Sequence, residues 1–480
     1  MGEGIVMKTL LLTTAFFAVL MTYGQNDSLL NVSLKEAQEY AIKNSPVMKS
    51  AQLDIESARK KVWETTAIGL PQVSGKVSYS YMITVPPTLE MFNSFSGLGE
   101  NFGTIYGMIG QLAAQQGNLP VLQQLDSLSK ASSQDAEEAA TIDDMRWGLT
   151  ADLTVSQLVF SGAYLVGLQT TRVFKSLTEL ALTRSEKDLR QNVASGYYLV
   201  LMVEENARVL DSTLNATQKL YNEMKKISEA GLMDETDVDQ LRITVSNINN
   251  AKKALDRQRE VAYNLLKYQM GCDLKTRLVL KETLNSFISE PEINQLALEP
   301  FAVENTPEFQ LLETQVRMNE LNVKLNKAAF LPDIAAFYQH QENFNDKSFS
   351  FTPPDMFGLS MSIPIFSSGS RMAKLSQARI SLEKTRYSQE QAVQGMMLDY
   401  ESSKNALLNA YDKYITNREN MNLAEKINNR TLSKFREGLS SSMELTQAQS
   451  QYLTAQSNFY NAMYELLTAK AKMEKMLNKE

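Results

Sequence analysis

Residues 73–85 read VSGKVSYSYMITV, and residues 147–156 read WGLTADLTVS. In both segments apolar and polar side chains alternate, so an extended chain would have one apolar face and one mainly polar face. Residues 357–366 follow the same rule, and residues 334–341 follow it more weakly because Phe337 is out of pattern. Period-two alternation of this kind predicts four strands, each with one apolar face.

Two environments suit such strands. Alternation over about ten residues is the signature of a strand in an outer-membrane sheet. The aromatic residues Tyr79, Tyr81, Trp147 and Phe357 lie towards one end of their segments, as in an interfacial girdle. A half-buried strand of a soluble antiparallel sheet alternates in the same way. The remaining sequence is mostly long helices with no obvious soluble core for four strands to cover, and this favours lipid contact.

The chain contains an internal duplication. Three motifs recur in order: Asn44-Ser45-Pro46 as Asn305-Thr306-Pro307, Leu70-Pro71 as Leu331-Pro332, and Gly231-Leu232 as Gly438-Leu439. The motifs delimit a first repeat at residues 25–271 and a second at residues 301–480, joined by a connector at residues 272–300. The first repeat also carries an insert at residues 86–145 that has no counterpart in the second.

Helices are expected between the strands. Ser33 and Glu36 have the spacing of a capping box, which predicts a helix start. After Gly162 there is no proline until residue 291, and Gly231 is the main break in this helical stretch. Residues 164–230 would form a helix about 100 Å long. We therefore predict coiled-coil-like antiparallel hairpins that turn near Gly231 and Gly438, although the helices alone would also fit a soluble rod.

The N-terminus resembles a secretory signal peptide at residues 1–24. Met7-Lys8 supplies a basic start, residues 10–21 form an apolar core, and small residues precede a cut after Gly24. An apolar run of this length is too short to span a bilayer. Translation could begin at Met1 or at Met7, and both remain open. The sequence thus predicts export from the cytoplasm.

Composition and motifs disfavour several function classes. The net charge of −7 argues against a nucleic-acid partner, which would need a basic face. The single cysteine, Cys272, cannot form an intrachain disulfide or a CxxC metal site. The single histidine, His340, has no triad partner at a recognisable spacing, and no Walker, HExxH or GxSxG motif is present. We expect no enzymatic activity and no cofactor or metal.

Oligomerisation follows from the lipid interpretation. Strands in hydrocarbon must close into a barrel because an unpaired backbone group there costs several kcal/mol. Four strands are too few, since the smallest barrels have about eight. Several chains related by a closed rotation must therefore contribute strands to one barrel.

In these features the sequence resembles the TolC-like outer-membrane efflux protein family. The resemblance rests on the duplicated helix–strand–strand–helix order, on the two Leu-Pro motifs, and on Val159–Gly162 with its counterpart Ile365–Gly369. It also rests on the two Gly-Leu turns. It implies an α+β membrane protein in which each chain adds four strands to a shared transmembrane β-barrel and extends a long α-helical barrel into the periplasm.

The resemblance further implies a function and partners. The chain would be one subunit of a homotrimer that provides a passive exit duct for efflux or secretion. It would contact outer-membrane lipid and dock on a periplasmic adaptor and an inner-membrane transporter near the helix tips. Drug, metal-ion, polysaccharide and protein substrates all remain open.

At the tips, the family closes its tunnel with a charged latch of tyrosine, arginine and aspartate. The matching positions here are Phe435, Ser440, Glu444 and Gln447, with Asp237 in the first repeat. Phe435 lacks a hydroxyl group and Ser440 lacks a charge, so the resemblance implies that this latch cannot form. Glu444 would instead supply a ring of three carboxylates at the constriction, which favours cations. Asp237 could also serve as a helix N-terminal charge.

The insert at residues 86–145 would lie outside the cell between two strands. It is strongly acidic, and we predict a cap that screens the barrel mouth, unless it is a loop without effect. The alternative role is divalent-cation binding by Asp135, Glu137, Glu138, Asp143 and Asp144.

Two other protein classes share some of these features. A periplasmic coiled-coil interaction protein, such as an adaptor, would share the helices but should show a compact β-rich module. An exported hydrolase would need a nucleophile and base that the sequence does not offer.

Overall fold

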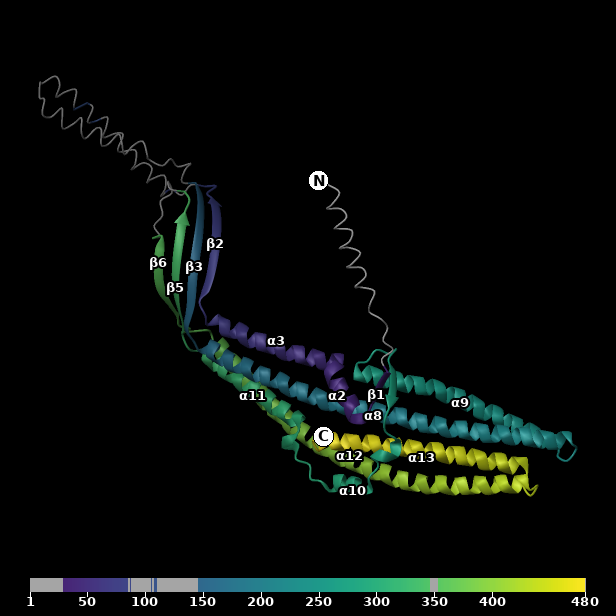
Figure 1. Cartoon of the computed structure of the whole chain (residues 1–480). Coiled ribbons are helices and arrows are strands. Elements are labelled where there is room, and N and C mark those ends of the chain that lie inside the picture. Colours follow the sequence, from purple (N-terminus) through teal and green to yellow (C-terminus); the bar gives the residue numbers. More distant parts are fainter. Residues whose placement is uncertain are drawn as a thin grey trace, which may run out of the picture. The chain divides into compact units, whose positions relative to one another are not determined.

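The computed structural model describes residues 29–84, 146–345 and 353–479, with positions 87, 105, 108 and 109 between them. The predicted signal peptide and the predicted acidic insert lie outside these residues, apart from those four positions. Figure 1 shows the described elements along the chain. None of the helices in the described ranges is both long and apolar enough to cross a membrane.

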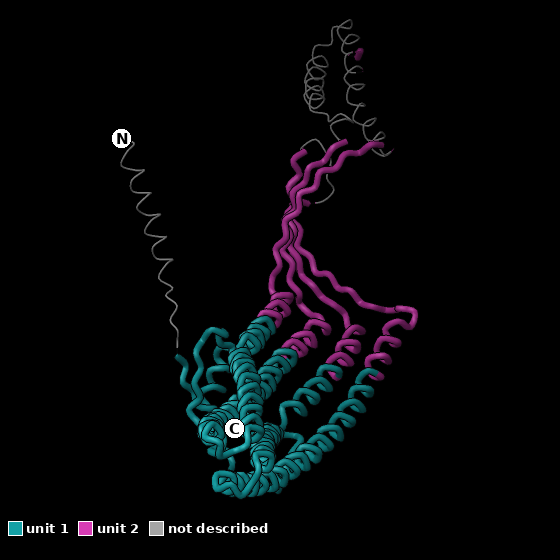
Figure 2. The backbone as a smooth tube through the Cα atoms, turned by 90° about the vertical axis from the view of Figure 1, so that its right-hand side faces the viewer, with its two compact units in different colours: residues 1–59, 173–319, 381–480 teal, residues 60–172, 320–380 magenta. Residues whose placement is uncertain are grey.

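The chain separates into two compact units. One comprises residues 1–59, 173–319 and 381–480, and the other comprises residues 60–172 and 320–380. Figure 2 colours the first teal and the second magenta. The helices α3 (Pro46–Ile68), α8 (Gly162–Glu229), α11 (Pro307–Ala328) and α12 (Ser370–Arg436) each run from one unit into the other.

The smaller unit contains a four-stranded sheet. Its strands are β2 (Gln72–Tyr81), β3 (Trp147–Ser161), β5 (Asp333–Asn343) and β6 (Asp355–Ser362). They lie in the order β2-β3-β5-β6, and every neighbouring pair is antiparallel. The outer strands β2 and β6 therefore each have one edge without a partner strand among the described residues.

The strand ends differ from the sequence predictions. β2 ends at Tyr81 rather than near residue 85, and β5 extends to Asn343 rather than 341. β3 continues to Ser161, five residues beyond its predicted end, with an irregularity in register between Leu158 and Phe160. β6 covers residues 355–362 instead of 357–366. Pro364 accounts for the early end of β6 because a proline has no N–H to donate to the ladder.

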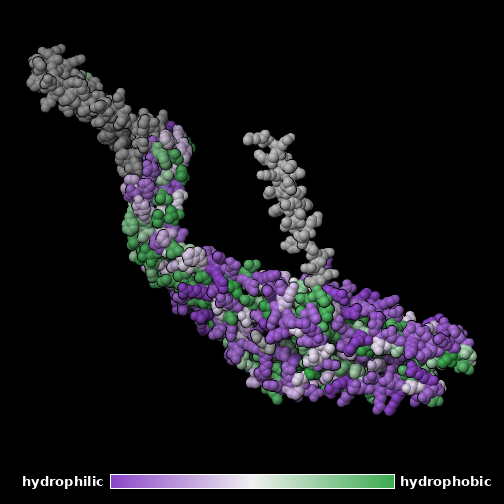
Figure 3. Space-filling view, in the orientation of Figure 1, coloured by the Kyte–Doolittle hydropathy of each residue, from purple (hydrophilic) through white to green (hydrophobic). Residues whose placement is uncertain are grey.

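The pairing register places the alternating apolar residues on a single face. Val77 opposes Ala151, and Tyr81 opposes Trp147. We call this surface the apolar face; its other apolar members are Val73, Tyr79, Leu149, Leu153, Val155, Phe160, Ile334, Ala336, Tyr338, Phe357, Leu359 and Met361. In the view of Figure 3, hydrophobic residues gather on the strands, whereas the long helices are mainly hydrophilic.

Phe337, which breaks the alternation, lies on the opposite face. It stands directly across from Gly358 of β6. A Cβ atom on Gly358 would lie 2.5 Å from the Phe337 ring, so the ring occupies the space that a side chain would need. Packing of the Phe337 ring against Gly358 thus explains why Phe337 departs from the alternation.

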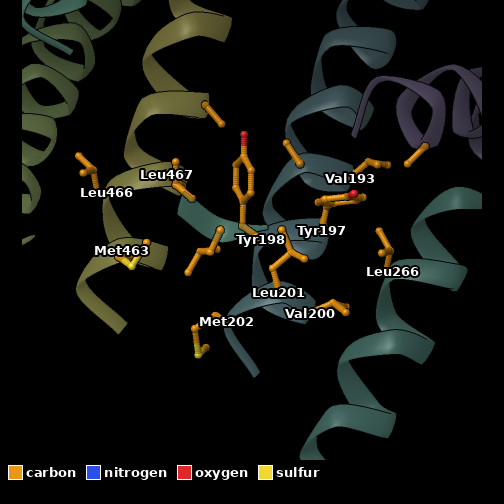
Figure 4. Packing of buried hydrophobic residues seen from close by; sticks show 14 of the residues in the cluster. Val193, Tyr197, Tyr198, Val200, Leu201, Met202, Leu266, Met463, Leu466 and Leu467 are labelled. Atoms are coloured by element: carbon orange, nitrogen blue, oxygen red, sulfur yellow. The ribbon is translucent and has the colours of Figure 1, made fainter. Parts of the chain in front are cut away.

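The larger unit is built on helices around a main hydrophobic core. Besides parts of the four long helices it contains α2 (Leu34–Asn44), α9 (Glu235–Met270), α10 (Glu290–Leu298) and α13 (Ser442–Met476). Figure 4 shows side chains of α8, α9 and α13 converging, among them Val193, Leu266 and Met463, which are fully buried. A period-3.6 apolar stripe on each helix accounts for this packing.

A two-stranded parallel pair lies beside this core. β1 (Leu29–Val32) pairs with β4 (Arg277–Leu280), which belongs to the connector between the repeats. The buried Tyr197 hydroxyl of α8 lies 2.9 Å from the Glu282 carboxylate and 3.1 Å from the Val32 carbonyl oxygen. The same carboxylate oxygen accepts from the Leu34 N–H at 2.7 Å. Burial is the main cause that raises the pKa of Tyr197, and the nearby Glu282 carboxylate raises it further. The phenol therefore keeps its proton and remains a hydrogen-bond donor.

Removing the Tyr197 hydroxyl should destabilise the β1–β4 strand pair. We expect Tyr197→Phe to lower the free energy of unfolding by about 1–3 kcal/mol, because the buried Val32 carbonyl oxygen and the partly buried Glu282 carboxylate lose a hydrogen-bond donor. The measurement is a denaturant titration followed by circular dichroism. Tyr387→Phe, at an exposed tyrosine of α12, is the matched control and should change stability little. Equal effects of the two substitutions would contradict the proposed importance of this hydrogen bond.

Candidate functional site

The tips of the two helical hairpins carry the predicted site residues. Gly231, between α8 and α9, has φ 76°, and Gly438, between α12 and α13, has φ 75°. A glycine adopts this left-handed conformation without steric cost. Glycine is therefore the usual residue at the position just after the end of a helix. Asp234 and Ser441 then cap the N-termini of α9 and α13. In both hairpins, therefore, a left-handed glycine follows the first helix and a capping residue precedes the second.

Phe435 lies in a hydrophobic cluster that joins the two hairpins. Its side chain is only 3 % exposed. We call this group the tip cluster; it consists of Leu220, Met224, Val238, Leu241, Phe435 and Leu445, drawn from α8, α9, α12 and α13. All four helix ends bury side chains together, so hydrophobic contact holds the hairpins to one another at this point.

Hydrogen bonds reinforce the same junction. The Ser442 hydroxyl of α13 donates to Asp237 Oδ1 of α9. Further along these helices, the Thr244 and Thr446 hydroxyl oxygens are 3.2 Å apart. Asp237 therefore links the two hairpins, and its partner Ser442 was not predicted from the sequence. No local pattern identifies Ser442, because the contact joins positions 205 residues apart.

Glu444 and Ser440 form a separate local arrangement. The Glu444 carboxylate accepts from the Ser440 hydroxyl and, at 3.1 Å, from the Ser441 N–H. The hydrogen bond from Ser440 has the largest effect in holding the pKa of Glu444 below its usual value. The hydrogen bond from Ser441 and the positive charge of Lys434 act in the same direction. Glu444 is exposed and ionised, and it completes a capping box at the start of α13. Gln447 is exposed on α13 about one turn later.

Asp237 and Glu444 occupy equivalent positions of the two repeats but bind differently. Each is the third residue after its capping residue. Glu444 reaches back to the backbone of its own cap, as glutamate does in a capping box. Asp237 has one methylene fewer and binds the other hairpin instead. The structure brings Asp237 to Ser442 and Ser440 to Glu444, while Phe435 belongs to the tip cluster.

His340 has polar partners in the sheet. It lies on the apolar face of β5, opposite Asp355 of β6, with its Nδ1 atom 2.8 Å from Asp355 Oδ1. The Tyr338 hydroxyl donates to the same oxygen at 2.6 Å. Across the part of the chain that the structure describes, no group of three His, Cys, Asp or Glu side chains is placed to hold a metal ion. The His340 contacts link two neighbouring strands.

Comparisons with known proteins agree with this architecture. Residues 301–479 match the model of the family described as Outer membrane efflux protein. The probable efflux pump outer membrane protein TtgC of Pseudomonas putida is 23% identical over 328 residues, which is 63% of this chain and 65% of TtgC. The alkaline protease secretion protein AprF of Pseudomonas aeruginosa is 24% identical over 181 residues, or 36% of each chain. The chain thus spans somewhat less than two thirds of TtgC.

Solved structures share the fold over nearly the whole chain. The crystal structure of CusC has a TM-score of 0.69 and 17% identity, and the match covers 96% of both chains. The outer membrane protein VceC of Vibrio cholerae has a TM-score of 0.65 and 12% identity, covering 93% of this chain and 96% of VceC. These similarities establish the fold.

Proposed function

We infer that this chain, a member of the TolC-like outer membrane efflux protein family, is a subunit of an outer-membrane channel that serves as a passive exit duct. The observation that carries this proposal is the apolar face, which is continuous over four strands of a sheet and largely exposed. A face of this kind is stable in hydrocarbon and costly in water. We place the strands in the outer membrane and the helices in the periplasm.

The open edges of the sheet support a shared barrel. Because all neighbouring strands are antiparallel, β2 and β6 of one chain run in opposite directions. The β6 edge of one copy can therefore pair with the β2 edge of the next and keep the antiparallel order. We propose a homotrimer whose twelve strands close the barrel, since unpaired edges are not tolerated in lipid.

We further propose that the helix tips dock on a periplasmic adaptor and an inner-membrane transporter, which would supply energy and select the substrate. The names of the relatives include an efflux pump component and a protease secretion protein. One relative, ArpC, is named as an antibiotic efflux pump protein and another, AprF, as an alkaline protease secretion protein, so the names refer to different substrates. This diversity supports a duct whose selectivity depends on its partner.

The decisive experiment is membrane fractionation followed by SDS electrophoresis without heating. We expect the protein in the outer-membrane fraction as a trimer that dissociates to monomer on boiling. A soluble periplasmic marker and an inner-membrane marker control the fractionation. Recovery as a soluble periplasmic monomer would overturn the channel proposal and support the alternative of a coiled-coil interaction protein.

The proposed Glu444 ring leads to a separate prediction. We expect Glu444→Gln to reduce the cation preference and the block by multivalent cations in single-channel recordings, because three negative charges leave the constriction. Glutamine can also act as the third residue of a capping box, so the substitution removes charge while preserving the helix start. Glu437→Gln, an exposed acid just before Gly438, is the control. Unchanged selectivity in Glu444→Gln would place the constriction elsewhere.

A further inference from the structure

The helix ends of the smaller unit carry a high density of positive charge. These ends adjoin the strands and are drawn in magenta with them in Figure 2. We call their cationic residues the basic cluster, which consists of Lys60, Lys61, Arg172, Lys324, Lys327, Arg371, Lys374 and Arg379. The same helix ends and the adjoining strand ends contain three acids, Glu64, Glu320 and Asp333. Eight cations and three acids give this region a net charge of +5, whereas the whole chain has −7.

Most of this charge is exposed and not neutralised by neighbouring side chains. Every member of the basic cluster is exposed except Arg371, which is half-buried and donates to the Pro364 carbonyl oxygen at 3.0 Å. Lys61 forms an ion pair with Glu64 at 2.8 Å. Within the part of the chain that the structure describes, the other members form no ion pair. The cluster therefore has positive charge available for an anionic partner.

Exposed apolar side chains share helix faces with these cations. Trp63 follows Lys60 by three residues in α3, and Met372 precedes Arg379 by seven residues in α12. Both separations place the two residues on the same face of a helix. Trp63 and Met372 are each 63 % exposed. The faces that carry the positive charge thus also carry apolar groups that nothing in the described structure covers.

The segments between the helices and the strands extend this apolar surface. Ile365 and Phe366 lie between β6 and α12 and are 91 % and 84 % exposed. Leu70, between α3 and β2, is also exposed. Apolar side chains in this state are costly in water and stable in hydrocarbon. We therefore expect the faces that carry Trp63 and Met372 to point towards lipid rather than into the aqueous duct, continuing the apolar face of the sheet.

The distances suit contact with lipid headgroups. Arg172 is the member farthest from the strands along its helix, about 15 Å at 1.5 Å per residue. A headgroup layer is about 5–8 Å deep, and charges act over a further screening length of about 8 Å at physiological salt. Lysine and arginine side chains also extend their charged ends towards headgroups, and tryptophan is enriched at this level. The whole basic cluster therefore lies within range of the membrane surface.

We propose that the basic cluster binds anionic phospholipids, such as phosphatidylglycerol, in the periplasmic leaflet of the outer membrane. The proposal rests on the outer-membrane location proposed above. The cations bind the headgroup phosphates, and the adjoining apolar side chains lie against the acyl chains. Each lysine or arginine near an anionic surface strengthens the attraction about fivefold, so even a few contacts select anionic over zwitterionic lipid.

The two tryptophans of the chain allow the lipid at each end of the sheet to be measured separately. Trp147→Phe leaves Trp63 as the reporter, and Trp63→Phe leaves Trp147. The assembled full chain is reconstituted in vesicles in which either phosphatidylglycerol or phosphatidylcholine is brominated, because bromine quenches a tryptophan that it contacts. We expect Trp63 to favour phosphatidylglycerol about fivefold. Trp147 should show no such preference, because the acids Glu342 and Asp355 lie on the apolar face towards that end.

The outcomes separate this proposal from the channel proposal. Equal quenching of Trp63 by the two brominated lipids, with the trimer inserted, would overturn lipid selection and leave the channel proposal intact. The cations would then be available to an acidic protein or to the duct. Failure of the trimer to float with vesicles of any composition would overturn both proposals.

Charge substitutions locate the contact. The cluster variant combines Lys60→Gln, Lys324→Gln and Lys374→Gln, at exposed lysines of three helices. With Trp63 as the reporter, it should reduce the preference for phosphatidylglycerol to about twofold or less. The matched control should leave the preference near fivefold; it replaces three exposed lysines of the larger unit, Lys226→Gln, Lys253→Gln and Lys426→Gln. Equal loss in both would contradict the assignment. If the cluster variant does not assemble, the comparison of the two tryptophans decides the question.

Discussion

Val77→Lys should prevent assembly of the protein in the outer membrane. Val77 is 73 % exposed on the apolar face, in the middle of β2. A lysine facing hydrocarbon near the bilayer centre costs about 2–4 kcal/mol in each chain. In a trimer the penalty applies three times. The measurement is the yield of heat-dissociable trimer in the outer-membrane fraction, which should fall to a small fraction of wild type.

The neighbouring residue provides the control. Ser78 follows Val77 in β2 and therefore points to the opposite, polar face. Ser78→Lys adds the same side chain one position along the strand and should leave assembly near the wild-type level. Normal assembly of Val77→Lys together with failure of Ser78→Lys would mean that the lipid-facing side has been assigned incorrectly.

Phe435→Ala should open the helix tips. Replacing a fully buried phenylalanine by alanine typically costs about 3–5 kcal/mol, because hydrophobic contact is lost and a cavity remains. We expect the hydrogen-bonded backbone amides just after the first turns of α9 and α13 to exchange with deuterium about 100-fold faster than in wild type, since Val238 and Leu445 hold these turns in the tip cluster. If the tips narrow the duct, single-channel conductance should rise in the same variant.

Leu439→Ala is the matched control for this substitution. Leu439 follows Gly438 in the same turn but is 73 % exposed, so its truncation should alter tip stability by less than about 0.5 kcal/mol. Unchanged exchange in Phe435→Ala would show that the hydrogen bonds, such as that from Ser442 to Asp237, hold the hairpins without the cluster. Equal acceleration in both variants would indicate a general loosening of the turn.

The sequence by itself determined the local elements. Period-two alternation placed strands within residues 73–85, 147–156 and 357–366, because side chains of a strand point alternately to two faces. Gly231 and Gly438 were recognisable as turns, since a left-handed residue after a helix is usually glycine. The capping box of Ser33 and Glu36 likewise located a helix start, which the structure has at Leu34. These features depend on residues only a few positions apart.

The tertiary structure decided what depends on distant residues. The register of β5 against β6 places Phe337, which breaks the alternation, directly across from Gly358. Its ring occupies the space beside this glycine. The two repeats carry acids at equivalent positions, yet Asp237 binds the other hairpin and Glu444 its own helix cap. Such contacts join positions far apart in the chain, and no periodicity within a single segment encodes them.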